Sequence, residues 1–283
     1  MKYENYIFDL YGTLVDIRTD EGKTELWEKL ALFYGYYDAH YTPEELKLRY
    51  GELVSGKEQE LKEQILEKEA KEAKDGGISE NVTRTQKKED DVHEAHPEIK
   101  IEYVFQKLFE EKGVKADLTL AVHAGQFFRI LSTEYVRLYD GVVELLSTIK
   151  KAGKPIYLLS NAQRIFTEYE MHTLGIAEYF DDILISSECS VKKPDERFYK
   201  ILLDRHPMKL EDSIMIGNDA NSDIAGAKGV GLHTFYIHSN ISPKLPEIEV
   251  KDEKGKKKTV LQMPEADIVL EEMDMKKVLE LLQ

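Results

Sequence analysis

The chain has 283 residues, of which 42% are hydrophobic and 33% are charged. This length suits one large domain or a core with a second module, and the apolar fraction excludes a wholly disordered chain. The formal net charge of -15 argues against nucleic acid or an anionic membrane as the main partner, because like charges repel. A phosphate substrate would therefore need a local cation.

The cysteine content and the N-terminal sequence predict where the protein resides. Cys189 is the single cysteine, which excludes an internal disulfide and suits a reducing compartment. The first residues are too polar for a signal peptide, and no apolar run is long enough to span a bilayer. We therefore expect a cytoplasmic monomer or homodimer that acts on a small molecule, with no membrane and no nucleic-acid partner.

The N-terminal half begins with one strand pattern and continues with helical patterns. Residues 6–10 form an apolar run that ends in a loop containing Gly12, which predicts a buried strand. Helical patterns then follow at 21–34, 43–73, 100–112 and 118–135. They predict an all-helical insertion over 17–138. Because its middle is polar and highly charged, we expect residues 76–98 to form a mobile loop.

Strand and helix patterns alternate in the second half of the chain. Strand patterns occur at 155–160, 183–186, 213–217, 233–237 and 266–270, and helical patterns at 142–152, 165–174, 197–204 and 225–230. This alternation predicts an α/β fold, with a Rossmann-like parallel sheet covered by helices on both faces. The core domain would comprise residues 1–16 and 139–283. Residues 248–250 and 259–261 flank a charged tip at 254–256 and predict a β-hairpin.

The first chemical signal is Asp9, at the end of the first predicted strand. A carboxylate at the carboxyl edge of a parallel sheet, where ligands bind, can serve as a nucleophile. Gly12 permits a tight loop whose backbone N–H groups face an anion. An isolated aspartate is also a common turn cap, so Asp9 alone does not define a site.

Two more signals follow later strands. Ser160 and Asn161 directly follow the second strand pattern, where a hydroxyl and the N–H groups of the next helix can hold a phosphate or carboxylate oxygen. Lys193 follows the third strand pattern, and its ammonium could neutralise both the nucleophile and the developing charge on the substrate. Turn chemistry would explain Ser160 and Asn161 equally well, and a surface position would explain Lys193.

The fourth signal is a pair of acids after the strand at 213–217. Asp219 and Asp223 are separated by three residues and could bind Mg²⁺ directly or through water. An Asx turn with a helix N-cap is the alternative interpretation. The alternatives become improbable together, because an acid, a hydroxyl, a lysine and paired acids follow successive strands in this order.

These four clusters resemble the four motifs of the haloacid dehalogenase superfamily. The resemblance implies a Rossmann-like core and identifies the 17–138 insertion with the helical C1 cap of that superfamily. It implies that Asp9 is the nucleophile and that the carbonyl of residue 11, here Tyr11, binds Mg²⁺. Thr13 would support the loop and contact the transferring group.

The resemblance also assigns the residues that surround the nucleophile. Ser160 would bind a substrate oxygen, together with Asn161 and the loop around Gly12. Lys193 would stabilise charge. Mg²⁺ would be held by Asp9, the Tyr11 carbonyl, Asp219 and Asp223. In the longer-spaced form of the last motif, Asn218 takes the position of the metal acid; we favour Asp219, because asparagine is the poorer ligand.

Two departures from the superfamily pattern point in opposite directions. Phosphatases of the superfamily usually carry a second aspartate, which protonates the leaving group, at the position of Tyr11, whereas the Asp-x-Tyr-Gly-Thr form is typical of metal-independent 2-haloacid dehalogenases. The Tyr11 hydroxyl could donate this proton instead, although its reference pKa of about 10 makes it a weaker acid than a carboxyl group. The retained Asp219 and Asp223 favour Mg²⁺, since neighbouring carboxylates repel each other unless a cation lies between them. We predict a Mg²⁺-dependent phosphohydrolase of small metabolites. The alternatives are a 2-haloacid dehalogenase and a catalytically weak phosphometabolite-binding protein.

Overall fold

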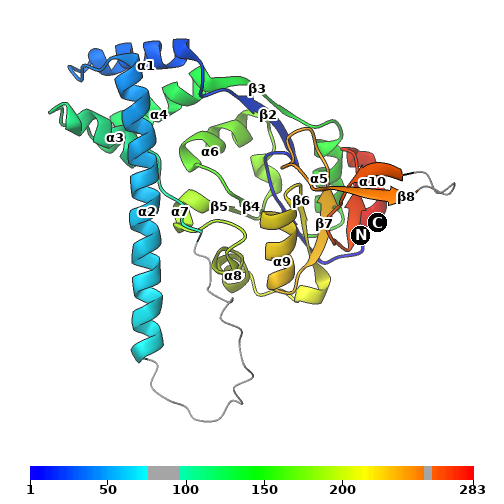
Figure 1. Ribbon diagram of the computed structural model, residues 1–283. Coiled ribbons are helices and arrows are strands. Elements are labelled where there is room, and N and C mark those ends of the chain that lie inside the picture. Colours follow the sequence, from blue (N-terminus) through cyan, green and yellow to red (C-terminus); the bar gives the residue numbers. More distant parts are fainter. Residues whose placement is uncertain (76–95, 252–256) are drawn as a thin grey trace.

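The computed structural model of the protein describes residues 1–75, 96–251 and 257–283. Its centre is a six-stranded parallel sheet in the order β10-β7-β6-β1-β4-β5 (Figure 1). The strands are β1 (Asn5–Phe8), β4 (Ile156–Ser160), β5 (Asp182–Ile185), β6 (Ser213–Gly217), β7 (His233–Ile237) and β10 (Ile268–Leu270). Each corresponds to a predicted strand, and the predicted α/β fold is confirmed.

Helices cover both faces of this sheet. Because successive side chains of a strand point to opposite faces, Tyr6 and Phe8 of β1 pack in one apolar cluster and Ile7 packs in another. The first cluster includes side chains of α5 (Val142–Lys151) and α10 (Met275–Leu282), and the second those of α8 (Glu196–Arg205) and α9 (Gly226–Gly229). Burial on both faces explains why the strands read as continuous apolar runs.

Shorter helical segments connect the strands of the sheet. They are α6 (Arg164–Thr173), α7 (Ser186–Cys189), the 3₁₀ turns Ala177–Tyr179 and Leu210–Asp212, and a π-helical segment, Ala220–Ala225. The π-helical segment directly follows Asp219, whose carboxylate accepts hydrogen bonds from its first N–H groups. The loops after β4, β5 and β6 are therefore each followed closely by helical backbone.

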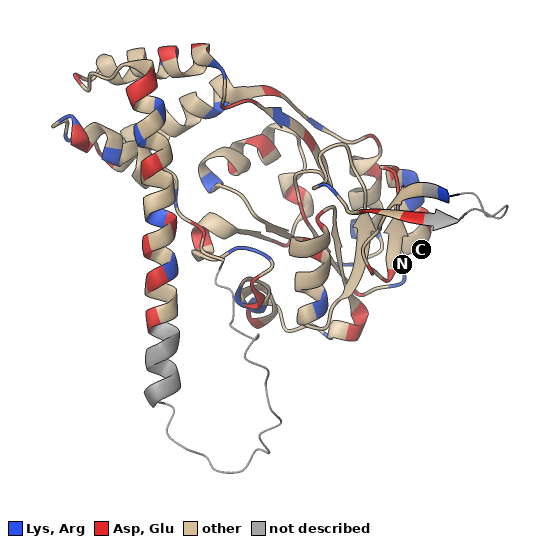
Figure 2. Cartoon of the chain, viewed as in Figure 1, with Lys and Arg blue, Asp and Glu red and all other residues tan. Residues whose placement is uncertain are grey.

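The predicted cap contains α1 (Thr24–Gly35), α2 (Pro43–Asp75), α3 (Glu102–Glu111) and α4 (Leu118–Ser132). These helices share an apolar cluster of their own, separate from the clusters of the sheet, in which Trp27, Tyr34, Phe105 and Phe128 are buried. Figure 1 shows them beside the sheet, with α2 extending well beyond the other three. Acidic and basic side chains alternate along α2, as expected for a helix that largely faces solvent (Figure 2).

One predicted helix is partly wrong. The helical pattern at 118–135 ends at Ser132, and β3 (Thr133–Leu138) pairs antiparallel with β2 (Val15–Thr19). β-branched and aromatic residues in this stretch favour a pleated strand once a partner strand is available. The insertion is therefore not helical at 17–19 and 133–138. The predicted boundary between residues 16 and 17 lies within β2, and the division into two domains remains a prediction.

The predicted hairpin is confirmed, because β8 (Glu247–Lys251) and β9 (Lys257–Leu261) pair antiparallel. Its predicted tip at 254–256, and residues 76–95 of the predicted loop, lie outside the described residues. Residues 96–98 differ from the prediction of a mobile loop: Pro97 forms a β-bridge with Val191, and Glu98 is only 9% exposed. None of the helices in the described ranges combines the length and the apolar character needed to cross a membrane.

Candidate active site

The four polar clusters meet at the carboxyl edge of the sheet. Strands β6, β1, β4 and β5 are neighbours, so the loops that follow them lie side by side. They enclose a pocket of about 190 Å³. Its lining includes most of the predicted site residues. The complete set of lining residues is Asp9, Tyr11, Ser160, Asn161, Lys193, Asn218, Asp219, Ser222, Asp223, Ile241 and Pro243. The predicted convergence on Asp9 is thus present in the structure.

A buried ammonium group joins two of the acids. Lys193 Nζ donates to Asp9 Oδ1 at 2.8 Å, to Asp223 Oδ1 at 2.7 Å and to the Leu159 carbonyl at 2.6 Å. Burial alone would lower the pKa of Lys193, but the Asp223 and Asp9 carboxylates outweigh it and raise that pKa. For the Asp9 and Asp223 carboxylates, the expected cation between them is therefore the ammonium group of Lys193.

Asn161 holds the backbone of that lysine. Its Nδ2 donates to the Lys193 carbonyl at 2.9 Å, and its Oδ1 accepts from the Lys193 N–H at 2.8 Å. Both polar atoms of the Asn161 side chain are thus engaged with Lys193. The side chain therefore fixes the lysine loop, and the predicted role of Asn161 in substrate binding remains a prediction.

The loop after β1 is shaped by a glycine and a threonine. Gly12 has a φ of +86°, and a Cβ at this position would lie 2.2 Å from Asn218 Nδ2. A side chain is therefore excluded both by conformation and by space. Thr13 Oγ1 lies 3.3 Å from Asp9 Oδ2 and from Asn218 Oδ1, and it donates to these oxygens. Thr13 thus orients the Asp9 carboxylate, and its predicted role in support of the loop remains a prediction.

Ser160 is the polar side chain at this edge that lacks a partner. The residue is 1% exposed, and its Oγ has no hydrogen-bond partner among the described residues. It lies in the same pocket as Asp9 and Lys193. A buried hydroxyl without a partner is uncommon in proteins, and here it is placed to bond a ligand oxygen.

Tyr11 directs its hydroxyl into the boundary between cap and core. The hydroxyl donates to Glu170 Oε2 at 2.6 Å and lies 3.1 Å from Thr167 Oγ1, both on α6. Arg129 of α4 pairs with the same glutamate, Nε to Oε1, at 2.7 Å. Burial and the Glu170 charge raise the pKa of Tyr11. The sequence suggested this hydroxyl as a substitute acid, whereas in the structure it is bound to Glu170.

Arg129 and Glu170 were not found from the sequence. Both lie on amphipathic helices at positions that carry no motif, and their pairing depends on how α4 packs against α6. The Arg129 guanidinium also lies 5.7 Å from the centre of the Tyr11 ring. An arginine and a glutamate on two apolar helix faces are weak signals by themselves, although a buried pair was to be expected if the faces met.

The last motif is tightly folded around Asp223. Asp223 Oδ2 accepts from the N–H groups of Asn218 at 3.0 Å and of Asp219 at 2.9 Å. Burial raises the pKa of Asp223 to about 7; Lys193 opposes this shift and Asp9 adds to it. Asp219 Oδ1 caps the following helical segment, 2.8 Å from the Asn221 nitrogen. The choice between Asn218 and Asp219 as a metal ligand therefore remains a prediction.

The donor set at this edge fits a hard divalent cation. Asp9, Asp219 and Asp223 line one pocket with Tyr11, and carboxylate and carbonyl oxygens are the ligands that Mg²⁺ prefers. Three carboxylates face one ammonium group, which leaves an excess of negative charge. Within the described ranges, however, no three His, Cys, Asp or Glu side chains are grouped as a ready-made metal site. A cation would have to draw them together.

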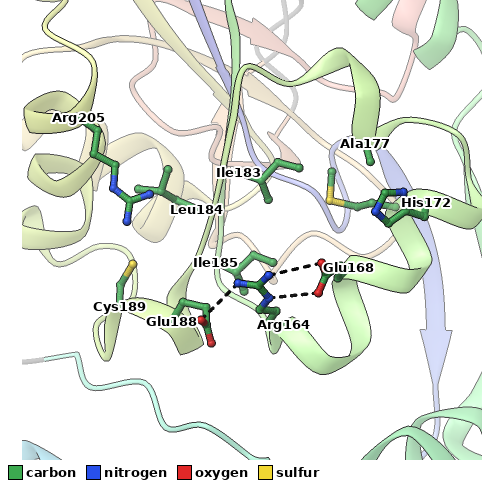
Figure 3. A pocket seen from close by; sticks show the side chains of 11 residues that line it. Arg164, Glu168, His172, Ala177, Ile183, Leu184, Ile185, Glu188, Cys189 and Arg205 are labelled. Carbon is green, nitrogen blue, oxygen red and sulfur yellow. Dashed lines mark hydrogen bonds and ion pairs between the residues drawn. The ribbon is translucent and has the colours of Figure 1, made fainter. Parts of the chain in front are cut away.

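A second cavity, of about 340 Å³, lies beside the edge strand β5 and contains none of the predicted site residues (Figure 3). Figure 3 shows Arg164 directed at Glu168 and Glu188, at 3.2 and 3.4 Å. Cys189 also lines it, and burial raises the pKa of this thiol, so the cysteine is not an activated nucleophile. This cavity therefore offers no activated cysteine, and the predicted site residues lie in the pocket around Asp9.

The fold and this pocket define an α/β protein in which an aspartate, a lysine and a serine meet at the carboxyl edge of a parallel sheet. A family profile described as hydrolase, haloacid dehalogenase-like hydrolase, matches residues 3–231. The chain belongs to this family. The resemblance found in the sequence motifs is thereby confirmed at the level of the family.

Individual relatives match part of the chain. The HAD-hydrolase YfnB of Bacillus subtilis is 28% identical over 51% of this chain and 60% of its own length. A phosphoserine phosphatase of Thermus thermophilus is 27% identical over 52% of this chain and 57% of its own length. This chain therefore spans less than two thirds of these relatives.

A solved structure with the same fold extends further along the chain. The HAD phosphatase of Thermococcus onnurineus has a TM-score of 0.50 and 12% identity, over 99% of this chain and 97% of that chain. At this identity the likeness concerns the fold alone. It agrees with the parallel sheet and the helical insertion described above.

Proposed function

We propose that the protein is a Mg²⁺-dependent phosphohydrolase of small phosphorylated metabolites that works through a covalent intermediate on Asp9. The observation that carries this proposal is Ser160: its buried Oγ lacks a partner and lies in one pocket with Asp9 and Lys193. A phosphate oxygen would satisfy this hydroxyl. The cytoplasmic location expected from the composition is part of the same proposal.

The residues allow a two-step displacement. Asp9 Oδ2 attacks phosphorus, a bond forms from this oxygen to phosphorus, and the bond from phosphorus to the leaving oxygen breaks. Water then attacks the aspartyl phosphate, releasing inorganic phosphate and restoring the carboxylate. Lys193 holds Asp9 Oδ1 at 2.8 Å throughout and neutralises charge beside it. Mg²⁺, held by Asp9, the Tyr11 carbonyl, Asp219 and Asp223, would neutralise the phosphate oxygens.

Residue 11 restricts the leaving group. The Tyr11 hydroxyl is bound to Glu170, so position 11 offers no acid to protonate a departing alkoxide. General acid help is typically worth about 10²–10⁴-fold in rate. We therefore expect good leaving groups, as in aryl and acyl phosphates, to be hydrolysed much faster than simple alkyl phosphates.

The named phosphatases among the relatives support phosphoryl chemistry at the level of the class. The Thermus relative is named for phosphoserine, at 27% identity over about half of this chain. An identity of 27% over about half of this chain does not transfer the substrate of that relative. The proposal is therefore limited to a small phosphorylated metabolite.

A metal-independent 2-haloacid dehalogenase is the second candidate, and Lys193 is the observation that favours it. Its ammonium already neutralises Asp9 and Asp223 without a metal. Asp9 would then attack carbon and form an ester, and halide would leave without needing an acid. The same tyrosine at position 11 suits this chemistry.

One comparison separates the two candidates. The intact chain is given p-nitrophenyl phosphate with Mg²⁺ or with EDTA, and halide release from 2-chloropropionate is measured in parallel. We expect phosphate release with Mg²⁺, loss of it in EDTA, and loss of it in Asp9→Asn. Asp20→Asn is the matched control, since Asp20 is exposed and its carboxylate caps the Gly22 N–H. Halide release in EDTA with no phosphate release would refute the phosphohydrolase.

A further inference from the structure

Part of the cap inserts beside the catalytic lysine. The 96–101 segment, which precedes α3, runs alongside the loop that ends in Lys193. The Glu98 N–H donates to the Ser190 carbonyl at 3.2 Å, and the Lys192 N–H donates to the His96 carbonyl at 3.0 Å. The backbone immediately before Lys193 is therefore hydrogen-bonded to the cap segment, not only to the core.

The carboxylate of Glu98 reaches the other catalytic loop. Glu98 Oε1 accepts from Gln163 Nε2 at 2.9 Å, and Oε2 accepts from Ser186 Oγ at 3.1 Å. Ser186 Oγ in turn accepts from the Ala162 N–H at 2.9 Å. Two successive hydrogen bonds, with Ser186 between them, thus connect Glu98 to the backbone that directly follows Ser160 and Asn161. At 9% exposure it is buried, so these bonds are little weakened by water.

Gln163 completes the connection from the side of the core. Its Nε2 also donates to the Ile99 carbonyl at 2.9 Å, and its Oε1 accepts from the Ile101 N–H at 3.0 Å. Every polar atom of this side chain is therefore bonded to the 96–101 segment. A glutamine that only aids solubility would face water, whereas Gln163 forms hydrogen bonds that hold three residues of the segment at the start of α6.

We propose that Glu98 and Gln163 are positioning residues through which the cap fixes the two loops that carry Ser160 and Lys193. The loops are also joined to each other, because Asn161 makes two hydrogen bonds to the Lys193 backbone. The 96–101 segment, the Ser160 loop and the Lys193 loop thus form one closed network. For its effect on turnover this proposal rests on the proposed function; its effect on structure does not.

The network predicts what the loss of Glu98 does. Without the carboxylate, Gln163 Nε2 and Ser186 Oγ lose an acceptor, and the 96–101 segment is held at this point by fewer bonds. The Ser160 and Lys193 loops then move relative to Asp9. A displacement of about 1 Å in a catalytic group can reduce the rate by about 10²-fold. The substrate pocket itself is not removed, so the loss falls on kcat more than on KM.

Amide hydrogen exchange of the intact chain tests the structural part. In Glu98→Ala we expect exchange at the Ala162, Lys192 and Lys193 amides to become at least about tenfold faster, because the bonds that protect them open more often. Glu98→Gln should stay within about threefold of the wild type, since the amide oxygen can accept from Gln163 and the amide nitrogen can donate to Ser186 Oγ. Unchanged exchange at these amides in Glu98→Ala overturns the proposal.

Glu58→Ala is the matched control. Glu58 is another cap carboxylate near this loop, but its side chain is 41% exposed and lies 3.8 Å from Lys192 Nζ, and we expect no change in exchange. If Glu98→Ala does not fold, Gln163→Ala carries the same expectation and the same refutation.

Kinetics with p-nitrophenyl phosphate and Mg²⁺ test the catalytic part. Glu98→Ala should lower kcat about tenfold to a hundredfold with KM changed less than about threefold, and Glu98→Gln should recover most of kcat. A kcat equal to that of the wild type overturns the positioning role while leaving the phosphohydrolase intact. A wild type without turnover refutes the proposed function, and the exchange measurement still decides the role of Glu98.

Discussion

Lys193→Met tests whether the buried lysine is the internal counter-ion of the site. Methionine keeps the length of the side chain and removes the charge. Asp9, Asp223 and Lys193 are 7%, 1% and 2% exposed, so the variant leaves two buried carboxylates facing each other. Removing one partner of a buried ion pair typically costs about 3–5 kcal/mol. We expect a loss of this size in the free energy of unfolding at pH 8.5, in EDTA, measured by urea titration.

The loss should depend on pH with a definite sign. Burial already raises the pKa of Asp223 to about 7, and without Lys193, which opposes this rise, the pKa moves further up. Below this pKa the folded variant holds a proton that the unfolded chain has released, because an unfolded aspartate titrates near 3.9. The variant's free energy of unfolding therefore falls as pH rises, and its deficit is larger at pH 8.5 than at pH 6.

Lys192→Met is the control for this experiment. Its ammonium lies 3.8 Å from Glu58 in a partly exposed pair, and we expect a change of at most about 0.5 kcal/mol. A Lys193→Met protein as stable as the wild type at pH 8.5 would refute the counter-ion role. So would a deficit that is larger at pH 6 than at pH 8.5, because the repelling carboxylates would then not be its cause.

Three further substitutions test the roles of Ser160, Tyr11 and Gly12. Ser160→Ala removes a hydroxyl without a partner, so the free energy of unfolding should stay within about 0.5 kcal/mol while kcat/KM for p-nitrophenyl phosphate falls at least about tenfold; a clear loss of stability in urea titration would contradict the open hydroxyl. Tyr11→Phe removes the bond to Glu170 and should cost about 1.5–3 kcal/mol, with kcat kept within about threefold; a hundredfold loss of kcat would restore the hydroxyl as an acid. Gly12→Ala places a Cβ 2.2 Å from Asn218 Nδ2, and we expect the soluble variant to lose nearly all turnover; wild-type rates would show that the loop can yield.

Much of the fold was predictable because its strands are buried on both faces. Continuous apolar runs such as 213–217, each followed by a polar loop, mark parallel strands, and parallel strands bring their carboxyl ends to one edge. The convergence of Asp9, Ser160 and Lys193 follows from this geometry. The motif order in the chain added the role of each residue, which the geometry alone would not have given.

The predictions from the sequence are wrong where a segment pairs with residues that are far away in the chain. The helix expected up to Tyr135 ends at Ser132, because the following residues pair with Val15–Thr19, more than 100 residues away in the chain. The 96–98 stretch is polar and was expected to be mobile, but Glu98 finds Gln163 and Ser186. Local sequence carries no trace of such partners, since a charged residue in a polar stretch has the same pattern whether it is exposed or buried.

The local sequence also does not show the partner of Tyr11, the residue that left the type of reaction undecided. From the sequence, its hydroxyl was a candidate acid; in the structure it joins the Glu170–Arg129 pair between α6 and α4. The side chain of Tyr11, in the loop that follows Asp9, is thus hydrogen-bonded at the boundary of the cap. The carbonyl of Tyr11 belongs to the backbone of this loop, beside Asp9. Position 11 can then serve as an anchor without affecting metal binding through the carbonyl.

Charge decides which substrate the site can accept. Three carboxylates, Asp9, Asp219 and Asp223, line a pocket whose cation is Lys193, so the pocket is negative by two charges when all three are ionised. A phosphate dianion entering it would meet charge of its own sign, and a haloacid carboxylate would meet the same repulsion at half the strength. The repulsion is removed by a divalent cation, or reduced by a proton on Asp223, whose pKa is raised to about 7. Because a dianion needs the larger compensation, we expect phosphate turnover in this pocket to require the metal, whereas haloacid turnover would need only the proton.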